Sequence, residues 1–330
     1  MLHFDIGDIR RLIVLVLAGC GALAPLGEVA AQNYPSRPVR MLVPFPPGGG
    51  SDTIARIVAQ KFSQALGQQV LVDNRAGASG NIAGDLAAKA AADGYTLLFG
   101  NSSLAISPGV YRKMSYSPSR DLVAISMASQ YPFTLVAHPA LPVKTVKDLV
   151  ALAKAKPNAL DYASSGAGTM SHMAMELLRL KTGVRITHLP YKGAAPQTVA
   201  LLTGEAQAAF IVLPVAVRHF KGGKLRGLGV AAPKRAAVAP DVPTMIESGI
   251  AGHSAVQWNG LFAPARTPQP ILAKLNQAWA GAVKDPEVSR RIIASGAEPS
   301  GNSAAEFAAF VKEETDKWAL VAKASGTKLD

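Results

Sequence analysis

The sequence predicts an α/β protein with two domains. From residue 39 onward, short runs of β-branched residues alternate with amphipathic stretches of helical period, which is typical of strand–helix–strand units and a largely parallel sheet. The chain has 330 residues, about twice the usual length of one domain. Since 49% of its side chains are apolar and it contains one cysteine, a large core can form without disulfides.

In the first half of the chain we expect three strands and two helices. The helix predicted over 51–66 carries Ile54, Val58 and Phe62 at four-residue spacing, which is the pattern of a helix with one face on a sheet. The second helix is predicted over 82–90. Strands are predicted at 39–45, 69–73 and 95–99.

The stretch 122–137 has strand character but contains Tyr131-Pro132. Proline inside an extended run marks a change of direction or a crossing point, so we predict the passage into a second domain there. The later elements follow the same pattern: strands at 133–137, 160–164, 186–189, 208–213, 225–230 and 258–263, and helices at 146–155, 171–181, 195–202, 244–249, 270–283 and 304–322.

The strand at 258–263 is placed to return the chain to the first domain. One domain is then built from two segments of the chain. We therefore predict domain I at 32–131 and 254–330, and domain II at 132–253.

Residues 1–31 are predicted to be a secretory signal peptide. Arg10-Arg11 precede an apolar run over 12–18, which is shorter than the about 20 residues that a membrane-spanning helix needs. Two cleavage sites compete. Ordinary signal peptidase would cut before Gln32, whereas a lipoprotein box at 17–20 would leave Cys20 carrying lipid. We favour the first, because the Ala- and Pro-rich stretch that follows Cys20 resembles continuing signal.

The formal net charge of +12 raises the question of nucleic-acid binding. No run of four or more Lys or Arg occurs, and aromatic residues are not interleaved with basic ones as in base-stacking surfaces. We therefore expect no nucleic-acid partner. The charge is better explained as a field that attracts small anions.

The loop over 44–52 is the first candidate binding site, because ligands of open α/β sheets bind at the carboxyl ends of strands. Gly48, Gly49 and Gly50 precede a predicted helix, where main-chain N–H groups favour an anion. The alternative is a flexible turn in which Ser51 caps the helix. The ending Gly-Lys-Ser/Thr of a P-loop is absent. Asp52 would repel a carboxylate, so we expect it to cap the helix or to meet a donor.

Other strand ends carry similar small and hydroxyl residues. Arg75 precedes a second small-residue loop and is either a ligand partner or a surface residue. Lys192 is either an anion contact or a solvated lysine. We identify no neighbouring carboxylate at ligand spacing for His172, so it is weak as a metal ligand or a base, and a surface or packing role is the alternative. The remaining hydroxyl-rich segments are 100–103 and 164–172.

No catalytic, metal-binding or cofactor-binding set is predicted. The six histidines are scattered, and the sequence has no HExxH motif and no GxSxG elbow. An exported hydrolase that uses a serine of the Ser164-Ser165 pair is the enzyme alternative, but no base is identifiable for it.

The ordered motifs of residues 34–325 resemble the Bug (TctC-like) family of periplasmic solute-binding receptors of tripartite tricarboxylate transporters. The matching segments are 34–40 (YPSRPVR), 43–52 (VPFPPGGGSD), 74–81, 189–193 (LPYKG), 222–230 (GGKLRGLGV), 241–244 (DVPT) and 260–264 (GLFAP).

The resemblance implies a type II periplasmic-binding-protein fold, in which two α/β domains joined by two crossing strands close like a flytrap on a carboxylate. It also implies a periplasmic location, membrane subunits as partners, and no enzymatic activity. A receptor that presents its ligand to a sensor kinase is the alternative role. The ligand residues that the resemblance and the loops together predict are Pro47, Gly48, Gly49, Gly50, Ser51, Asp52, Ser102, Ser103, Ser165, Gly166, Thr169, Ser171, His172 and Lys192.

One departure from the family pattern bears on the ligand. Many relatives have Phe-Asp-Asn where this chain has Phe210-Ile211-Val212. The missing acid would suit a ligand ammonium. We therefore expect a dicarboxylate, a tricarboxylate or an aromatic or other apolar carboxylic acid rather than an amino acid.

Overall fold

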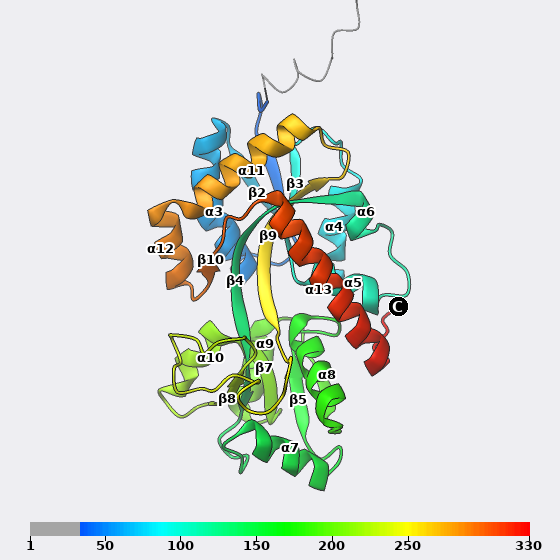
Figure 1. Cartoon of the computed structure of the whole chain (residues 1–330), viewed down its shortest axis with the longest axis vertical. Coiled ribbons are helices and arrows are strands. Elements are labelled where there is room, and N and C mark those ends of the chain that lie inside the picture. Colours follow the sequence, from blue (N-terminus) through cyan, green and yellow to red (C-terminus); the bar gives the residue numbers. More distant parts are fainter. Residues whose placement is uncertain (1–33) are drawn as a thin grey trace, which may run out of the picture.

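The computed structural model describes residues 34–330 (Figure 1). The predicted signal peptide, its two cleavage sites and Cys20 lie outside the described residues. Within 34–330, no helix combines the length and the apolar character that a membrane crossing requires.

The first sheet region has three parallel strands at its centre. β1 (Val39–Val43) lies between β2 (Val70–Asn74) and β3 (Thr96–Asn101). All three were predicted, to within two residues at either end. The sheet is mixed rather than wholly parallel, because β9 (Val256–Pro264) is antiparallel to β3.

Two long strands join the upper and lower parts of the molecule in Figure 1. β4 (Leu122–Ala137) pairs antiparallel with β9 from Leu122 to Pro132, and then exchanges partners. From Phe133 it pairs with β7 (Ala208–Val212) and β8 (Arg226–Val230). The strand is therefore continuous, and Tyr131-Pro132 marks the crossing point rather than a break.

The second sheet region continues from β4 through β7 to β5 (Asp161–Ser164) and β6 (Thr187–Pro190). β5 is parallel to both of its neighbours. Since β4 changes partners at Pro132, we propose the division predicted from the sequence: a first lobe of residues 34–131 and 254–330, and a second lobe of 132–253.

The helices cover the faces of these sheets. Trp279 is fully buried and makes edge contact with Phe62, with ring centroids 5.0 Å apart, which fixes two helices of the first lobe together. The helices are α3 (Gly50–Leu66), α4 (Asn81–Ala88), α5 (Ser103–Val110), α6 (Pro118–Asp121), α7 (Val146–Ala155), α8 (Met170–Thr182), α9 (Ala194–Thr203), α10 (Leu213–Phe220), α11 (Gln269–Lys284), α12 (Pro286–Ala294) and α13 (Ala304–Ser325), with a 3-10 turn at Ala78–Gly80 and a short strand β10 at Glu298–Pro299.

The last helix ties the two lobes together. α13 belongs to the first lobe by sequence, and it packs against α5 of that lobe and against α8 of the second lobe. In Figure 1 it runs from the upper part of the molecule along its side towards α8. Trp318 on α13 is fully buried, so this attachment is part of the core.

The structure corrects the element predictions at two kinds of place. The predicted helix at 244–249 is a series of turns that begins with a bridge from Thr244 to Val230. Four helices were not predicted: α5, α6, α10 and α12. Proline lies within α5 and in the first turn of the other three, and it interrupts the helical pattern in the sequence.

Candidate functional site

The predicted ligand loops lie where parallel strands lead into helices. β1 leads through residues 44–49 into α3, and β3 leads into α5 at Ser102. In the second lobe, β5 leads through residues 165–169 into α8, and β6 leads into α9. The lobes touch beside these loops, since Ser79 Oγ of the first lobe lies 3.4 Å from the carbonyl oxygen of Ala167 in the second.

The glycine loop, residues 47–50, is exposed and is held from behind by Asp52. The Asp52 side chain is buried and accepts hydrogen bonds from Gly48 N–H at 2.9 Å, Arg56 Nε at 3.0 Å and Asn74 Nδ2 at 2.9 Å. Burial pushes the pKa of Asp52 upward, but the bonds from Arg56, Gly48 and Asn74 outweigh it and leave the pKa below its usual value. The carboxylate thus faces donors of the protein, which fits the expectation that Asp52 meets a donor, and it does not cap α3.

Gly48 and Gly50 are glycines for different reasons. Gly48 has φ of +81°, a left-handed conformation that side chains disfavour. A Cβ at Gly50 would lie 3.1 Å from the hydroxyl of Tyr131 on β4. The loop therefore needs backbone freedom at one position and close approach to a crossing strand at the other.

Two predicted serines of the first lobe are bonded to β9. Ser51 Oγ donates to Asn259 Oδ1 at 2.8 Å, and Ser102 Oγ donates to Gln257 Oε1 at 2.9 Å. Both serines are buried. Ser103 is also buried and donates its N–H to Asn101 Oδ1 at 3.0 Å.

Gln257 and Asn259 were missed by the sequence analysis. They alternate with Trp258, which is fully buried, so the two amides share one face of β9 and the indole lies on the other. This period-two alternation was visible in the sequence. What the sequence lacked was the position of β9 between the two lobes, which brings these amides to Ser51 and Ser102.

The second-lobe loop, residues 164–172, is held by hydroxyl groups. Ser165 Oγ lies 3.1 Å from Thr169 Oγ1 and 3.0 Å from Ser171 Oγ. Thr169 donates its hydroxyl to the carbonyl of Gly166 at 2.7 Å, and Ser171 Oγ accepts Ser165 N–H at 2.9 Å. The four predicted site residues of this loop other than His172 are therefore bonded to one another.

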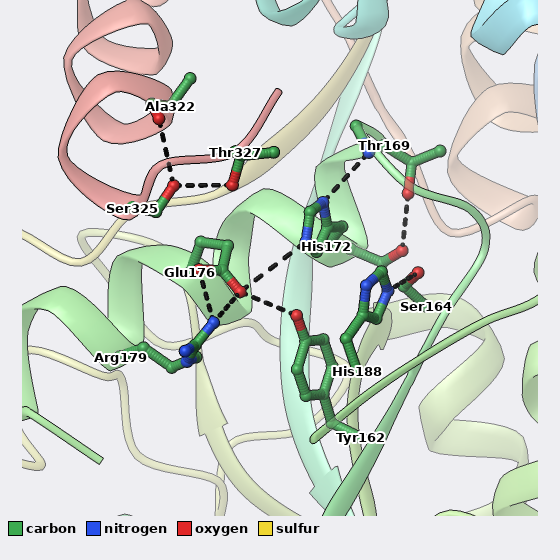
Figure 2. A network of polar contacts seen from close by, with 12 residues as sticks. Tyr162, Ser164, Thr169, His172, Glu176, Arg179, His188, Ala322, Ser325 and Thr327 are labelled. Carbon is green, nitrogen blue, oxygen red and sulfur yellow. Dashed lines mark hydrogen bonds and ion pairs between the residues drawn. The ribbon is translucent and has the colours of Figure 1, made fainter. Parts of the chain in front are cut away.

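Two imidazoles lie beside this loop, next to Thr169 and Ser164 (Figure 2). The rings of His172 on α8 and His188 on β6 are stacked with centroids 4.2 Å apart, and the ring of Tyr162 lies nearly parallel to both, 4.8 Å from His188 and 6.4 Å from His172. Gly168 N–H donates to His172 Nδ1 at 3.0 Å, and His188 Nε2 lies 2.6 Å from Ser164 Oγ. The predicted residue His172 thus contacts the loop itself.

Glu176 completes the cluster and corrects the sequence analysis, which assigned no carboxylate to His172. It lies one helical turn later, its Oε1 is 3.7 Å from His172 Nε2, and it accepts bonds from Tyr162 at 2.9 Å and from Arg179 at 2.7 Å. The i, i+4 spacing was a sufficient signal. Among residues 34–330, no group of three or more His, Cys, Asp or Glu is arranged to hold a metal ion.

The basic candidates differ in their surroundings. Arg75 is half exposed and pairs with Asp73 at 3.0 Å, which favours the surface role over the ligand role. Lys192 is exposed in the loop after β6 and forms no ion pair with any residue of the described range. Lys192 is the candidate cation that remains accessible to an anion at this edge.

The helices at this edge begin without side-chain caps. The N-cap residues of α3, α8 and α9 are Gly49, Thr169 and Gly193, and no side chain of these residues accepts a hydrogen bond from the first turn of its helix. Side-chain caps occur on α7, α12 and α13, at Thr145, Asp285 and Ser303. They are absent from α4, α5, α6, α10 and α11 as well, so the absence of a cap does not by itself single out α3, α8 and α9. The first-turn N–H groups of α3, α8 and α9 are therefore left for other acceptors.

Comparisons with known proteins agree on one family. A family model described as "Tripartite tricarboxylate transporter family receptor" matches residues 54–327. Protein BugT of Bordetella pertussis is 38% identical over 327 residues, which is 98% of this chain and 99% of that protein. A UPF0065 protein from the tcbD-tcbE intergenic region of Pseudomonas sp. is 35% identical over 92% of this chain and 91% of its own length.

Solved structures show the same fold. R. palustris Rpa4515 with adipate superposes with a TM-score of 0.82 at 35% identity, covering 90% of this chain and all of that one. The periplasmic binding protein BugD gives 0.79 at 32% identity with the same coverage. MatC from Rhodopseudomonas palustris with bound malate gives 0.77 at 33% identity, covering 88% of this chain and all of that one. The predicted two-domain periplasmic-binding-protein fold is confirmed.

Proposed function

Since this chain belongs to the receptor family of tripartite tricarboxylate transporters, we propose that it captures a small carboxylate between its two lobes. This family consists of solute-binding receptors rather than enzymes. Two structures similar to this chain are described with adipate and with malate, both of which are dicarboxylates. We carry that ligand class over to this chain as part of the proposal.

The observation that carries the proposal is the set of uncapped helix starts from both lobes. α3 begins in the first lobe, and α8 and α9 begin in the second, each directly after a parallel strand. Their free N–H groups and dipoles favour a negative group. Lys192 adds a full positive charge on the second-lobe side.

The acids at the site favour an anion without an ammonium group. Asp52 is the acid among the predicted ligand residues, and its carboxylate is occupied by Arg56, Asn74 and Gly48. Ile211, which replaces an acid of many relatives, is buried within β7. An amino-acid ligand would therefore lack a counter-charge, whereas a plain dicarboxylate or an aromatic acid would not need one.

Hydrogen bonds to a charged carboxylate are strong enough for such a site. Each contributes about 1.5–3 kcal/mol, and micromolar affinity needs about 8 kcal/mol. Three or four donors around one carboxylate thus supply most of the free energy before ordering costs are subtracted. Because the donors come from both lobes, binding favours the arrangement in which the lobes are close together.

We further propose that the receptor works in the periplasm and delivers its ligand to the membrane subunits of a tripartite transporter. The family description supports this role. Presentation of the same ligand to a sensor kinase is the second candidate. Deleting the genes of the membrane subunits separates the two, because uptake of the acid is lost only in the first case.

The ligand proposal is tested by calorimetric titration at pH 7.5 with adipate, malate, benzoate, glutamate and aspartate. We expect at least one plain acid to bind with micromolar or tighter affinity, and the amino acids to bind at least about 100-fold more weakly, since an unpaired ammonium costs several kcal/mol. Tight binding of glutamate or aspartate alone would contradict the proposed ligand class. No binding by any carboxylate would contradict the proposed function.

Closure of the lobes is tested by solution scattering. Saturation with the tightest acid of the panel is expected to reduce the radius of gyration, because the bound acid contacts both lobes. An unchanged radius with a saturating tight ligand would contradict capture between the lobes.

A further inference from the structure

The histidine pair of the second lobe is built into the protein on every side. His172 is 6% exposed, and its ring stacks on His188, which in turn stacks on Tyr162. The four residues Ser164, Gly168, His172 and His188 join β5, the loop, α8 and β6. Figure 2 shows His172 next to Thr169 and His188 next to Ser164 of this loop.

The hydrogen bond from Gly168 fixes the form of His172. Nδ1 accepts the Gly168 N–H at 3.0 Å, so it holds a lone pair and no proton. In the neutral ring the proton then lies on Nε2, which points towards Glu176 Oε1 at 3.7 Å. A second proton would have to go to Nδ1, where it would face the Gly168 N–H and break that bond.

On balance the groups around the pair disfavour a charged ring, although the charge of Glu176 acts to raise the pKa of His188. On α8, Glu176 is already bonded by Tyr162 from β5 and by Arg179, and Arg179 itself repels a positive imidazole. On β6, His188 would repel a charged His172 in the same way. α13 also packs against α8, and Figure 2 shows its last residue Ser325 and, just after the helix, Thr327, both uncharged.

Burial, followed by the charge of Arg179, lowers the pKa of His172 to about 4. Burial, followed by His172, lowers the pKa of His188 to about 4 as well. The cluster is therefore neutral over the pH range in which free imidazoles gain a proton.

We propose that His172 is a positioning residue: as a neutral imidazole stacked on His188, it holds Gly168 and so keeps residues 165–171 in the shape that receives the ligand. This role rests on the proposed function, since it assumes that the loop contacts the acid. It differs from direct ligand contact because both ring nitrogens face groups of the protein. It also makes the order of the loop depend on protons.

The first experiment follows amide hydrogen exchange of residues 165–171 and needs no ligand. The variants are His172→Ala, which removes the acceptor, and His172→Asn, whose Oδ1 can take the place of Nδ1 without titrating. His219→Asn, on α10 and outside the cluster, is the matched control. At pH 7.5 we expect the exchange protection of the loop amides to be about tenfold lower in H172A than in wild type, the effect of one lost hydrogen bond. In H172N and H219N the protection should stay within about threefold of wild type.

The pH dependence of the same measurement separates positioning from simple packing. The pKa of His172 is about 4 when the loop is ordered and returns to 6.5 when the loop opens, so protonation favours the open loop. The exchange protection of the loop amides should therefore fall about 30-fold between pH 7.5 and pH 5. We expect wild type and H219N to show this loss, and H172N to lack the part due to His172. Equal pH profiles for wild type and H172N, or equal exchange in H172N and H172A, would overturn the proposal.

The second experiment titrates adipate, or the tightest acid of the panel, into the same proteins at pH 7.5. We expect H172A to bind the acid about tenfold more weakly than wild type, because the loop has lost the hydrogen bond that fixes it. H172N keeps an acceptor for Gly168 and should bind within about threefold of wild type. Unchanged affinity in H172A would contradict the positioning role while leaving the proposed function intact. Failure of wild type to bind any acid would contradict the proposed function, and the exchange results would still decide whether His172 orders the loop.

Discussion

The glycine loop of the first lobe and loop 164–172 of the second lobe precede helices in the same way but are held by different chemistry. One ionised carboxylate, Asp52, gathers three donors behind the glycine loop. Neutral hydroxyls and two imidazoles hold the second loop. We therefore expect the two loops to lose stabilisation as the pH falls, but in different pH windows.

The largest expected effect is a loss of stability as the pH falls from 6.5 towards 4. Burial lowers the pKa of His172, His188 and His253 to about 4, so the unfolded chain binds more protons in this window and stability rises with pH across it. Each histidine contributes up to about 3 kcal/mol. Urea denaturation of wild type and H172N at several pH values measures the slope, which should be smaller in H172N.

The glycine loop should be unaffected in that window. The pKa of Asp52 lies below its ordinary value of 3.8, so its stabilising charge is kept above pH 3.8 and is lost only at lower pH. Hydrogen exchange at pH 5 should therefore show a loosened second loop beside an intact glycine loop. Equal loosening of both loops would show that a common opening, and not the histidine pair, governs the response.

The next effect is that of Asp52→Ala, which removes the acceptor of Gly48 N–H and one of the acceptors of Asn74 and of Arg56. We expect the free energy of unfolding to fall by about 2–3 kcal/mol. Breaking a buried ion pair costs more than breaking a surface pair, and this pair is intermediate because Arg56 is half exposed. Asp52→Asn, which keeps an acceptor of the same size, should cost about 1 kcal/mol. Denaturant midpoints measure both, and a D52A protein as stable as wild type would contradict the role of Asp52 as the anchor.

A smaller effect is expected for Ser164→Ala. The variant removes the partner of His188 Nε2 and the acceptor of Gly166 N–H, at about 1–2 kcal/mol, because Ser164 is fully buried. Ser165→Ala, at a partly exposed serine of the same loop, is the matched control and should cost less. Thermal melts at pH 7.5 compare the two variants. A larger loss of stability in S165A would show that the hydroxyl contacts of Ser165, and not the bond between Ser164 and His188, hold the loop.

The smallest effect is expected for Lys192→Gln, which changes affinity without changing stability. An exposed charge is screened by solvent, so we expect acid binding to weaken about three- to tenfold at low salt and to approach wild type at high salt. Lys221→Gln, at the end of α10, is the control for loss of one positive charge. Titrations at two salt concentrations measure the change in affinity. Identical affinities of the two variants would contradict a specific contact of Lys192 and would assign the effect to the net charge of the protein.

The sequence was sufficient where one local pattern decides an element. The four-residue spacing of Ile54, Val58 and Phe62 predicted α3 to within one residue, and the alternation of strands and helices predicted the fold class. It was insufficient where proline masks a helix, as at Pro214 in α10, or where several turns imitate one, as at 244–249. Local propensity and tertiary packing disagree at such places.

The site divides in the same way. Strand-to-helix loops rich in glycine and serine pointed to Gly48, Ser102 and Ser165. Pairings across the fold were not visible, because His172 and His188 are brought together by β5 and β6, and Ser51 meets Asn259 across 208 positions of the chain. Such contacts depend on the order of the strands in the sheet, which cannot be predicted from local sequence patterns.

The most direct test of carboxylate capture is a crystal structure of the protein with the tightest acid from the titration panel. We expect one carboxylate of the ligand to lie within hydrogen-bond distance of main-chain N–H groups at the starts of α3 and α8, so that both lobes contact a single molecule. An acid bound elsewhere, or held by the side chains of one lobe only, would contradict this expectation.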